Sequence, residues 1–159
     1  FMMFVGVNSL YIMVYMSLLV AFVFIYPGIL FNSLISIIGF GISLLLSIYL
    51  SYCIYFIMVC FAFWFGEVRS IVVAYNLGML MISGQYIPIR LFPENILSII
   101  QWTPIPYLAD IPVSIATGLI EYQEWITHIG FALIWCIILT STSLLIYRLG
   151  IKGYEAYGQ

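Results

Sequence analysis

Long apolar runs separated by short polar breaks dominate the chain and predict helices that cross a membrane. The runs cover about residues 8–30, 36–65, 71–87 and 125–147. At 1.5 Å per residue the first run reaches roughly 34 Å as a helix, enough for a hydrocarbon core of about 30 Å. The second run would reach roughly 45 Å, so it must tilt or end along the membrane interface. We therefore predict an all-α fold in which residues 1–159 form a single transmembrane domain with four spans.

The stretch between the last two predicted spans, residues 88–124, is apolar but interrupted by prolines. Proline cannot continue a helix interior, and a broken backbone in lipid leaves polar groups that protein or water must satisfy. This segment is therefore structured but is not a plain span, and its pattern predicts short helices at about 93–102 and 111–120. The residues that we expect to shape it are Pro88, Pro93, Pro104, Pro106, Pro112 and Gly118.

Composition supports a membrane protein. Hydrophobic residues make up 65% of the chain and charged residues 6%, whereas about a quarter of an average soluble domain is charged. All charged side chains lie at or beyond Glu67. A charge at mid-bilayer costs about 2.5 to 3.5 kcal/mol on insertion scales, so a long uncharged region is typical of spanning helices. Because the few basic residues form no patch, nucleic acid is excluded as a partner.

Basic residues favour the cytoplasmic side of a membrane and so indicate the orientation. If Arg148 and Lys152 are cytoplasmic, four spans return Arg69 to the same side and place Arg90 outside. Both termini of the chain are then cytoplasmic, and segment 88–124 is external. The acidic residues on the outer side would be Glu94, Asp110, Glu121 and Glu124.

Polar side chains within the spans are the candidates for a substrate path: Ser43, Ser47, Ser51 and Asn76. The three serines are four residues apart, so they share one face of the second helix. Small residues on one face allow tight helix packing, and a weakly polar wall of a transport path is the alternative interpretation. Asn76 is the most polar side chain in any span, and it indicates either an interhelical hydrogen bond or a cavity-lining role.

The sequence lacks the motifs of a self-contained enzyme. The single lysine, Lys152, lies outside any glycine-rich phosphate loop, and there is no HExxH motif. One histidine, His128, and one aspartate, Asp110, cannot supply a zinc triad or an aspartate pair. The three cysteines lie in apolar runs and are expected to pack as small hydrophobic residues: Cys53, Cys60 and Cys136. We expect no catalytic residue, cofactor or metal in this chain.

The order of motifs in the second half of the chain resembles the permease subunits of bacterial type-2 ATP-binding-cassette exporters, the ABC-2 family transporter proteins. The motifs are, in order, Ala62-Phe63-Trp64, Ser83-Gly84, Ile87-Pro88, Leu91-Phe92-Pro93, Pro104 with Tyr107, Pro112, Gly118 and the tail from Lys152 to Gly158. The resemblance lies in this series rather than in one motif.

This resemblance implies a subunit of the bacterial cytoplasmic membrane that pairs with a second permease and with separate ATPase subunits, which bind ATP and Mg²⁺. Substrate would move by alternating access, and segment 88–124 would form short re-entrant helices on the outer side. Glu67 and Arg69, in the predicted cytoplasmic turn, would be candidates for ATPase contact. Members of this family have six spans, so the four predicted here suggest the C-terminal part of a subunit.

Two other functions remain open from the residues. A non-transporting membrane partner, such as an immunity or assembly protein, would be a four-helix protein that is stable without an ATPase. An ion-coupled carrier usually has an ionisable residue within a span, and no predicted span has one in its middle. The substrate is not specified by the sequence.

Overall fold

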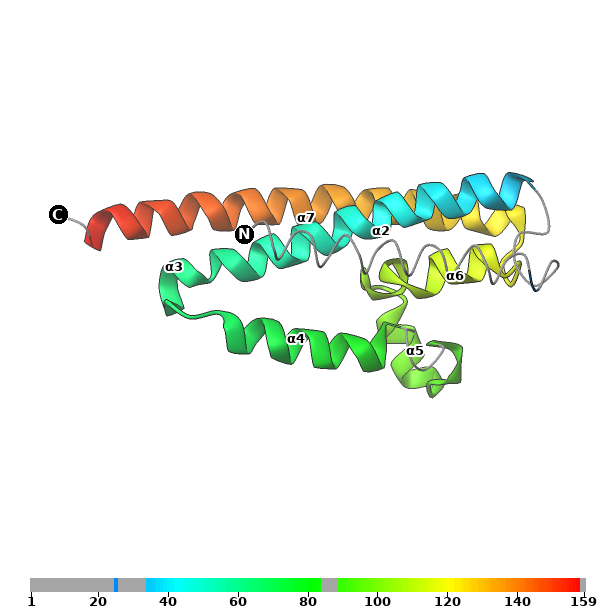
Figure 1. Ribbon diagram of the computed structural model, residues 1–159, viewed down its shortest axis with the longest axis horizontal. Helices are drawn as coiled ribbons and strands as arrows, with labels where there is room; N and C mark the ends of the chain where they lie inside the picture. The colour runs from blue at the N-terminus through cyan, green and yellow to red at the C-terminus, as the bar shows by residue number, and fades with distance from the viewer. Residues whose placement is uncertain (1–24, 26–33, 84–88, 158–159) are drawn as a thin grey trace.

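The computed structural model describes residue 25 and residues 34–83 and 89–157, and all regular elements in these residues are helical (Figure 1). The elements are α2 (Leu34–Cys60), α3 (Ala62–Phe65), α4 (Arg69–Ile82), the 3-10 helix η1 (Ile89–Leu91), α5 (Glu94–Ile100), the 3-10 helix η2 (Ile105–Leu108), α6 (Asp110–Ala116) and α7 (Tyr122–Tyr157). The first predicted span, apart from Ile25, and Pro88 lie outside the described residues.

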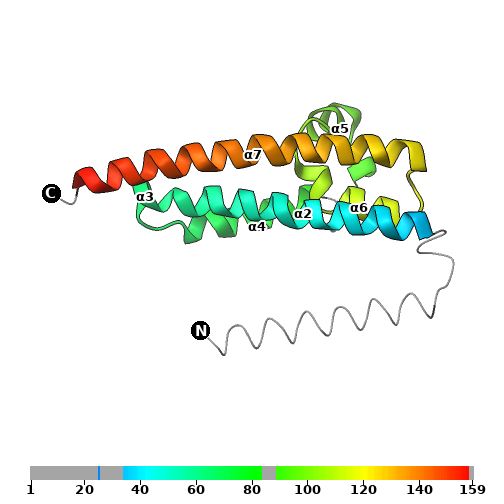
Figure 2. The ribbon, with the colours of Figure 1, turned by 90° about the horizontal axis from the view of Figure 1, so that it is seen from above.

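Two long helical segments form the body of the described structure. Ile35–Phe65 and Tyr122–Lys152 have 31 residues each, and both are long and apolar enough to cross a membrane. They coincide with the second and fourth predicted spans. They lie side by side and run in the same direction (Figures 1 and 2). The helix α7 continues past the apolar stretch to Tyr157.

The third predicted span, 71–87, is described only in part. Its helix α4 runs back in the opposite direction to α2 and ends at Ile82 after 14 residues (Figure 1). At 1.5 Å per residue this helix reaches about 21 Å, less than a hydrocarbon core of about 30 Å. Residues 84–87 of the predicted span lie outside the described residues.

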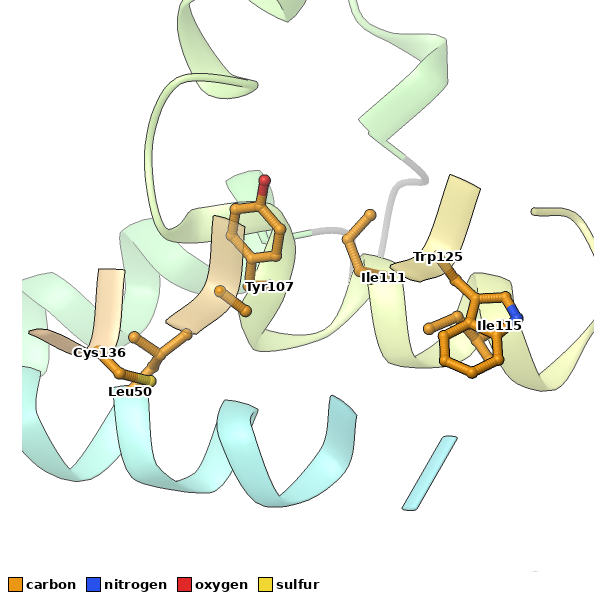
Figure 3. Packing of buried hydrophobic residues seen from close by; sticks show 7 residues of the cluster. Leu50, Tyr107, Ile111, Ile115, Trp125 and Cys136 are labelled. Carbon is orange, nitrogen blue, oxygen red and sulfur yellow. The ribbon is translucent and has the colours of Figure 1, made fainter. Parts of the chain in front are cut away.

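The core lies where α2, η2, α6 and α7 meet (Figure 3). Its buried members are Leu50, Tyr107, Ile111, Ile115, Trp125, Ala132 and Cys136. Gly39 brings α2 close to α7, since a Cβ there would lie 3.2 Å from the Trp125 ring. The three cysteines are buried and free, as expected for small packing residues.

The outer faces of the two long helices are apolar and exposed. Leu45 of α2 and Ile137 of α7 are 69% and 68% exposed, and similar residues follow along both helices. Exposed apolar surface of this extent is unusual for a soluble monomer and fits contact with lipid or with another membrane-embedded subunit.

Proline and glycine delimit the short helices, as their positions in the sequence predict. Pro93 precedes α5 and Pro104 precedes η2, positions that suit the restricted backbone of proline. Pro106 lies within η2, and Pro112 lies in the first turn of α6; both are buried. Gly118 has a φ of 68°, a left-handed conformation that commonly ends a helix. For this reason α6 ends at Ala116, four residues before the predicted end at 120.

Candidate functional site

A cavity of about 290 Å³ lies between α2 and α4, and we call it the α2–α4 cavity. Its lining residues are Ser51 and Tyr55 of α2, Tyr75, Asn76, Met79 and Leu80 of α4, Ser83 after α4, and Leu108 of η2. It combines hydroxyl and amide groups with apolar side chains in a bundle whose other surfaces are mostly apolar. The volume is close to the lower end of the range typical for small-molecule sites.

Hydrogen bonding and ring packing join the two walls of this cavity. The Tyr55 hydroxyl donates to Oδ1 of Asn76 at 2.5 Å. The rings of Tyr55 and Tyr75 pack edge to face, with centroids 5.7 Å apart. The Ser83 hydroxyl is fully buried and has no hydrogen-bond partner among the described residues.

The structure separates the four residues that the sequence suggested for a substrate path. Ser51 and Asn76 come together in the α2–α4 cavity. Ser47 is buried, and its hydroxyl donates to the Leu108 carbonyl at 2.5 Å. The Ser43 hydroxyl donates to the carbonyl of Phe40 in its own helix.

Ser43 borders a gap of about 10 Å³, which is too small for a substrate. The serine face therefore divides along its length. Its first part packs against the short helices, and its last residue, Ser51, faces the cavity.

Three lining residues with hydroxyl groups were not identified as candidates from the sequence: Tyr55, Tyr75 and Ser83. Tyrosine counts as apolar in a hydropathy pattern, so its hydroxyl is easily overlooked in a span. Tyr55 follows Ser51 by four residues, and this spacing places both on one helix face. That spacing is the signal that could have identified Tyr55. Ser83 appeared only in the Ser83-Gly84 motif of the family resemblance.

Glu67 and Arg69, the candidates for ATPase contact, are both exposed in the turn from α3 to α4. Gly66 permits this turn with a φ of 71°. The turn lies at the same end of the bundle as the C-terminus (Figure 2). Arg148 and Lys152 are close to the C-terminus in the sequence. The short helices α5 and α6 lie towards the opposite end (Figure 1). Three of the four Lys and Arg residues thus lie towards one end of the described bundle.

Within the described part of the chain, no group of three His, Cys, Asp or Glu side chains could hold a metal ion. The polar groups of the α2–α4 cavity are hydroxyls and one amide, which bind and orient a molecule by hydrogen bonds. The chemistry of these groups suits the binding or passage of a molecule through the cavity.

A family model described as ABC-2 family transporter protein matches residues 2–158. The chain belongs to the ABC-2 transporter family. The match covers both halves of the chain, whereas the motifs recognised in the sequence lay in the second half. As an ABC-2 family member with two helices of spanning length, the protein is a membrane transport component. No curated protein and no solved structure gives a significant match.

Proposed function

We propose that this protein is the permease subunit of an ATP-driven exporter and that the α2–α4 cavity forms part of its substrate path. The single observation that carries the second part is the meeting of Ser51 and Asn76 in one cavity. Family membership supports the first part. The energy would come from separate ATPase subunits, which bind ATP and Mg²⁺, and a second permease would complete the path.

Four spans and an external re-entrant segment are the membrane arrangement that we propose. The helices α5 and α6 have seven residues each, about 10 Å at 1.5 Å per residue, so neither can cross a membrane. Nevertheless α6 packs against α2 and α7, in the half of the bundle away from the C-terminus. Placing the basic end with Arg69, Arg148 and Lys152 in the cytoplasm makes this half the outer one. Both ends of the chain are then cytoplasmic, in a bacterial inner membrane.

The packing supports movement of α4 relative to the rest of the bundle. The helix α2 packs along much of its length against α7 but makes few contacts with α4. The Tyr55–Asn76 hydrogen bond and the Tyr55–Tyr75 ring contact are local ties across the cavity. A displacement of α4 away from α2 would therefore break few contacts among the described residues.

The turn before α4 is a suitable place for a partner to bind and displace this helix. Glu67 and Arg69 are exposed there, and Arg69 is the first residue of α4. A cytoplasmic ATPase that binds this turn would act directly on the helix that lines the cavity. The ATPase must favour one of two conformations by binding it more tightly, because only differential binding shifts such an equilibrium.

Co-purification tests this function. The native full-length protein would be expressed with the ATPase encoded beside it, purified and reconstituted in lipid nanodiscs, and assayed for ATP hydrolysis with Mg²⁺. We expect a stable complex whose hydrolysis rate differs from that of the ATPase alone. A permease that purifies as a stable protein and binds no ATPase would contradict the proposal and favour an immunity or assembly protein.

A further inference from the structure

A second and larger cavity, of about 470 Å³, lies between the short helices and α7. We call it the α5–α7 cavity. Leu97 of α5 and Gln101, the residue after α5, line one side of it. His128 and Phe131 of α7 also line it. It shares no lining residue with the α2–α4 cavity. Its volume lies within the range of about 300 to 1,000 Å³ that is typical of small-molecule sites.

Opposite charges line this cavity. Arg90 is the only basic residue between Arg69 and Arg148, and Asp110 begins α6. Both side chains are among the lining residues. The Arg90 guanidinium donates from Nη2 to the Ser114 hydroxyl at 3.1 Å, which ties it to α6 and leaves other donors of its fork available. The cavity therefore offers a fixed cation and a carboxylate to one occupant.

The remaining walls are aromatic and apolar. Trp102 is 78% exposed, and it lines the cavity together with Trp135 and Phe131. The Tyr107 hydroxyl points away from α2 (Figure 3). Aromatic faces attract ammonium groups, and indole rings suit the boundary between lipid and water. His128 adds a buried Nδ1 that has no hydrogen-bond partner among the described residues.

The charge pair restricts the class of ligand. An anionic amphiphile would be attracted by Arg90 but repelled by Asp110, and a cationic one would meet the reverse. A zwitterion satisfies both charges, because guanidinium binds phosphate by a fork of hydrogen bonds and carboxylate binds ammonium. An apolar tail would find apolar surface at Ile89 and Leu97.

We propose that the α5–α7 cavity binds a zwitterionic phospholipid, with its phosphate at Arg90 and its ammonium group at Asp110 and the aromatic rings. This site goes beyond the proposed export function, since lipid binding there requires neither ATP nor an ATPase. Failure of one proposal therefore leaves the other standing.

Native mass spectrometry of the full-length protein in detergent tests the site. The protein would be titrated with phosphatidylethanolamine, with anionic phosphatidylglycerol and with a cationic trimethylammonium lipid, all with the same acyl chains. We expect the ethanolamine lipid to bind about tenfold more tightly than either of the others, as the loss of one charged hydrogen bond predicts. Equal affinity for the three lipids would overturn the proposal. This comparison uses only the wild-type protein.

Two variants locate the binding. Arg90→Gln and Asp110→Asn should each weaken phosphatidylethanolamine binding about tenfold, and Asp110→Asn should also improve binding of phosphatidylglycerol. Glu121→Gln changes an exposed acid outside the cavity and should leave all affinities unchanged. Thermal unfolding confirms that each variant is folded. A folded Asp110→Asn protein with the lipid preference of the wild type would contradict the site.

Discussion

The hydroxyl of Tyr55 in α2 donates a hydrogen bond of 2.5 Å to the side-chain oxygen of Asn76 in α4. This bond crosses the α2–α4 cavity, and α4 otherwise makes few contacts with α2. Both side chains are exposed on the surface of the described helices. We infer that it holds α4 in the conformation seen in the structure.

Tyr55→Phe should therefore loosen α4. Interhelical hydrogen bonds in membranes contribute about 0.6 kcal/mol on average, so we expect a loss of stability of about 0.5 to 1 kcal/mol. The midpoint of thermal unfolding measures the loss. Tyr52→Phe is the matched control, because Tyr52 lies on the same helix with its side chain 63% exposed. An equal effect of the two variants would show that the Asn76 bond has no special role.

Gly150 marks a close approach between α7 and α3. A Cβ at this position would lie 2.8 Å from Cγ of the Phe63 ring, well inside van der Waals contact. Gly150→Ala should destabilise the protein by about 1 to 3 kcal/mol through overpacking. Gly130→Ala, in the same helix with nothing within 4 Å of its added Cβ, should have no such cost. In the double variant Gly150→Ala/Phe63→Leu, leucine is smaller than the phenylalanine that it replaces and should restore part of the lost stability. A double-mutant cycle would measure this effect.

Ser47 and Ser51 lie one turn apart but should respond differently to alanine. Ser47→Ala removes the donor to the Leu108 carbonyl and should cost about 1 to 3 kcal/mol of stability, measured by thermal unfolding. Ser51→Ala removes a hydroxyl from the cavity wall and should change ATP hydrolysis or transport in the reconstituted complex, with little loss of stability. The reverse pattern would mean that the packing and cavity-lining parts of this helix face are wrongly assigned.

The turn before α4 should carry the ATPase contact. Glu67→Ala combined with Arg69→Ala should weaken capture of the ATPase at least about tenfold, as expected when charged contacts at an interface are lost. Pull-down of the ATPase by the full-length permease measures this. The control is Glu121→Ala combined with Glu124→Ala, which alters exposed acids at the other end of the bundle. If both double variants retain full binding, the contact lies elsewhere.

The sequence predicted the two long helices of the described structure because their signal is local. Apolar length identified α2 and α7, and Pro93 placed the start of α5. The 3-10 helix η2, which follows Pro104, was not predicted. The end of α6 was placed four residues too late, because the apolar pattern continues past Gly118 and its left-handed turn. Local pattern thus fixes where a helix begins more reliably than where it ends.

The candidate sites depend on contacts between distant residues, and these were harder to predict. The spacing of Ser43, Ser47 and Ser51 correctly placed them on one face, but spacing alone cannot show that η2 covers only the first part. The Arg90 contact with Ser114 joins residues 24 positions apart across several turns. Such pairs become visible only when the chain is folded.

Accessibility of a single cysteine tests the central claim most directly. Ser51→Cys would be made after replacement of Cys53, Cys60 and Cys136 by alanine, and the permease–ATPase complex would be labelled from each side with a membrane-impermeant maleimide. Ser47→Cys, buried at 6% exposure, is the control that should react from neither side. Alternating access predicts that Cys at position 51 reacts from the cytoplasmic side without nucleotide and from the outer side with ATP bound. Labelling from one side only, unchanged by ATP, would contradict the account.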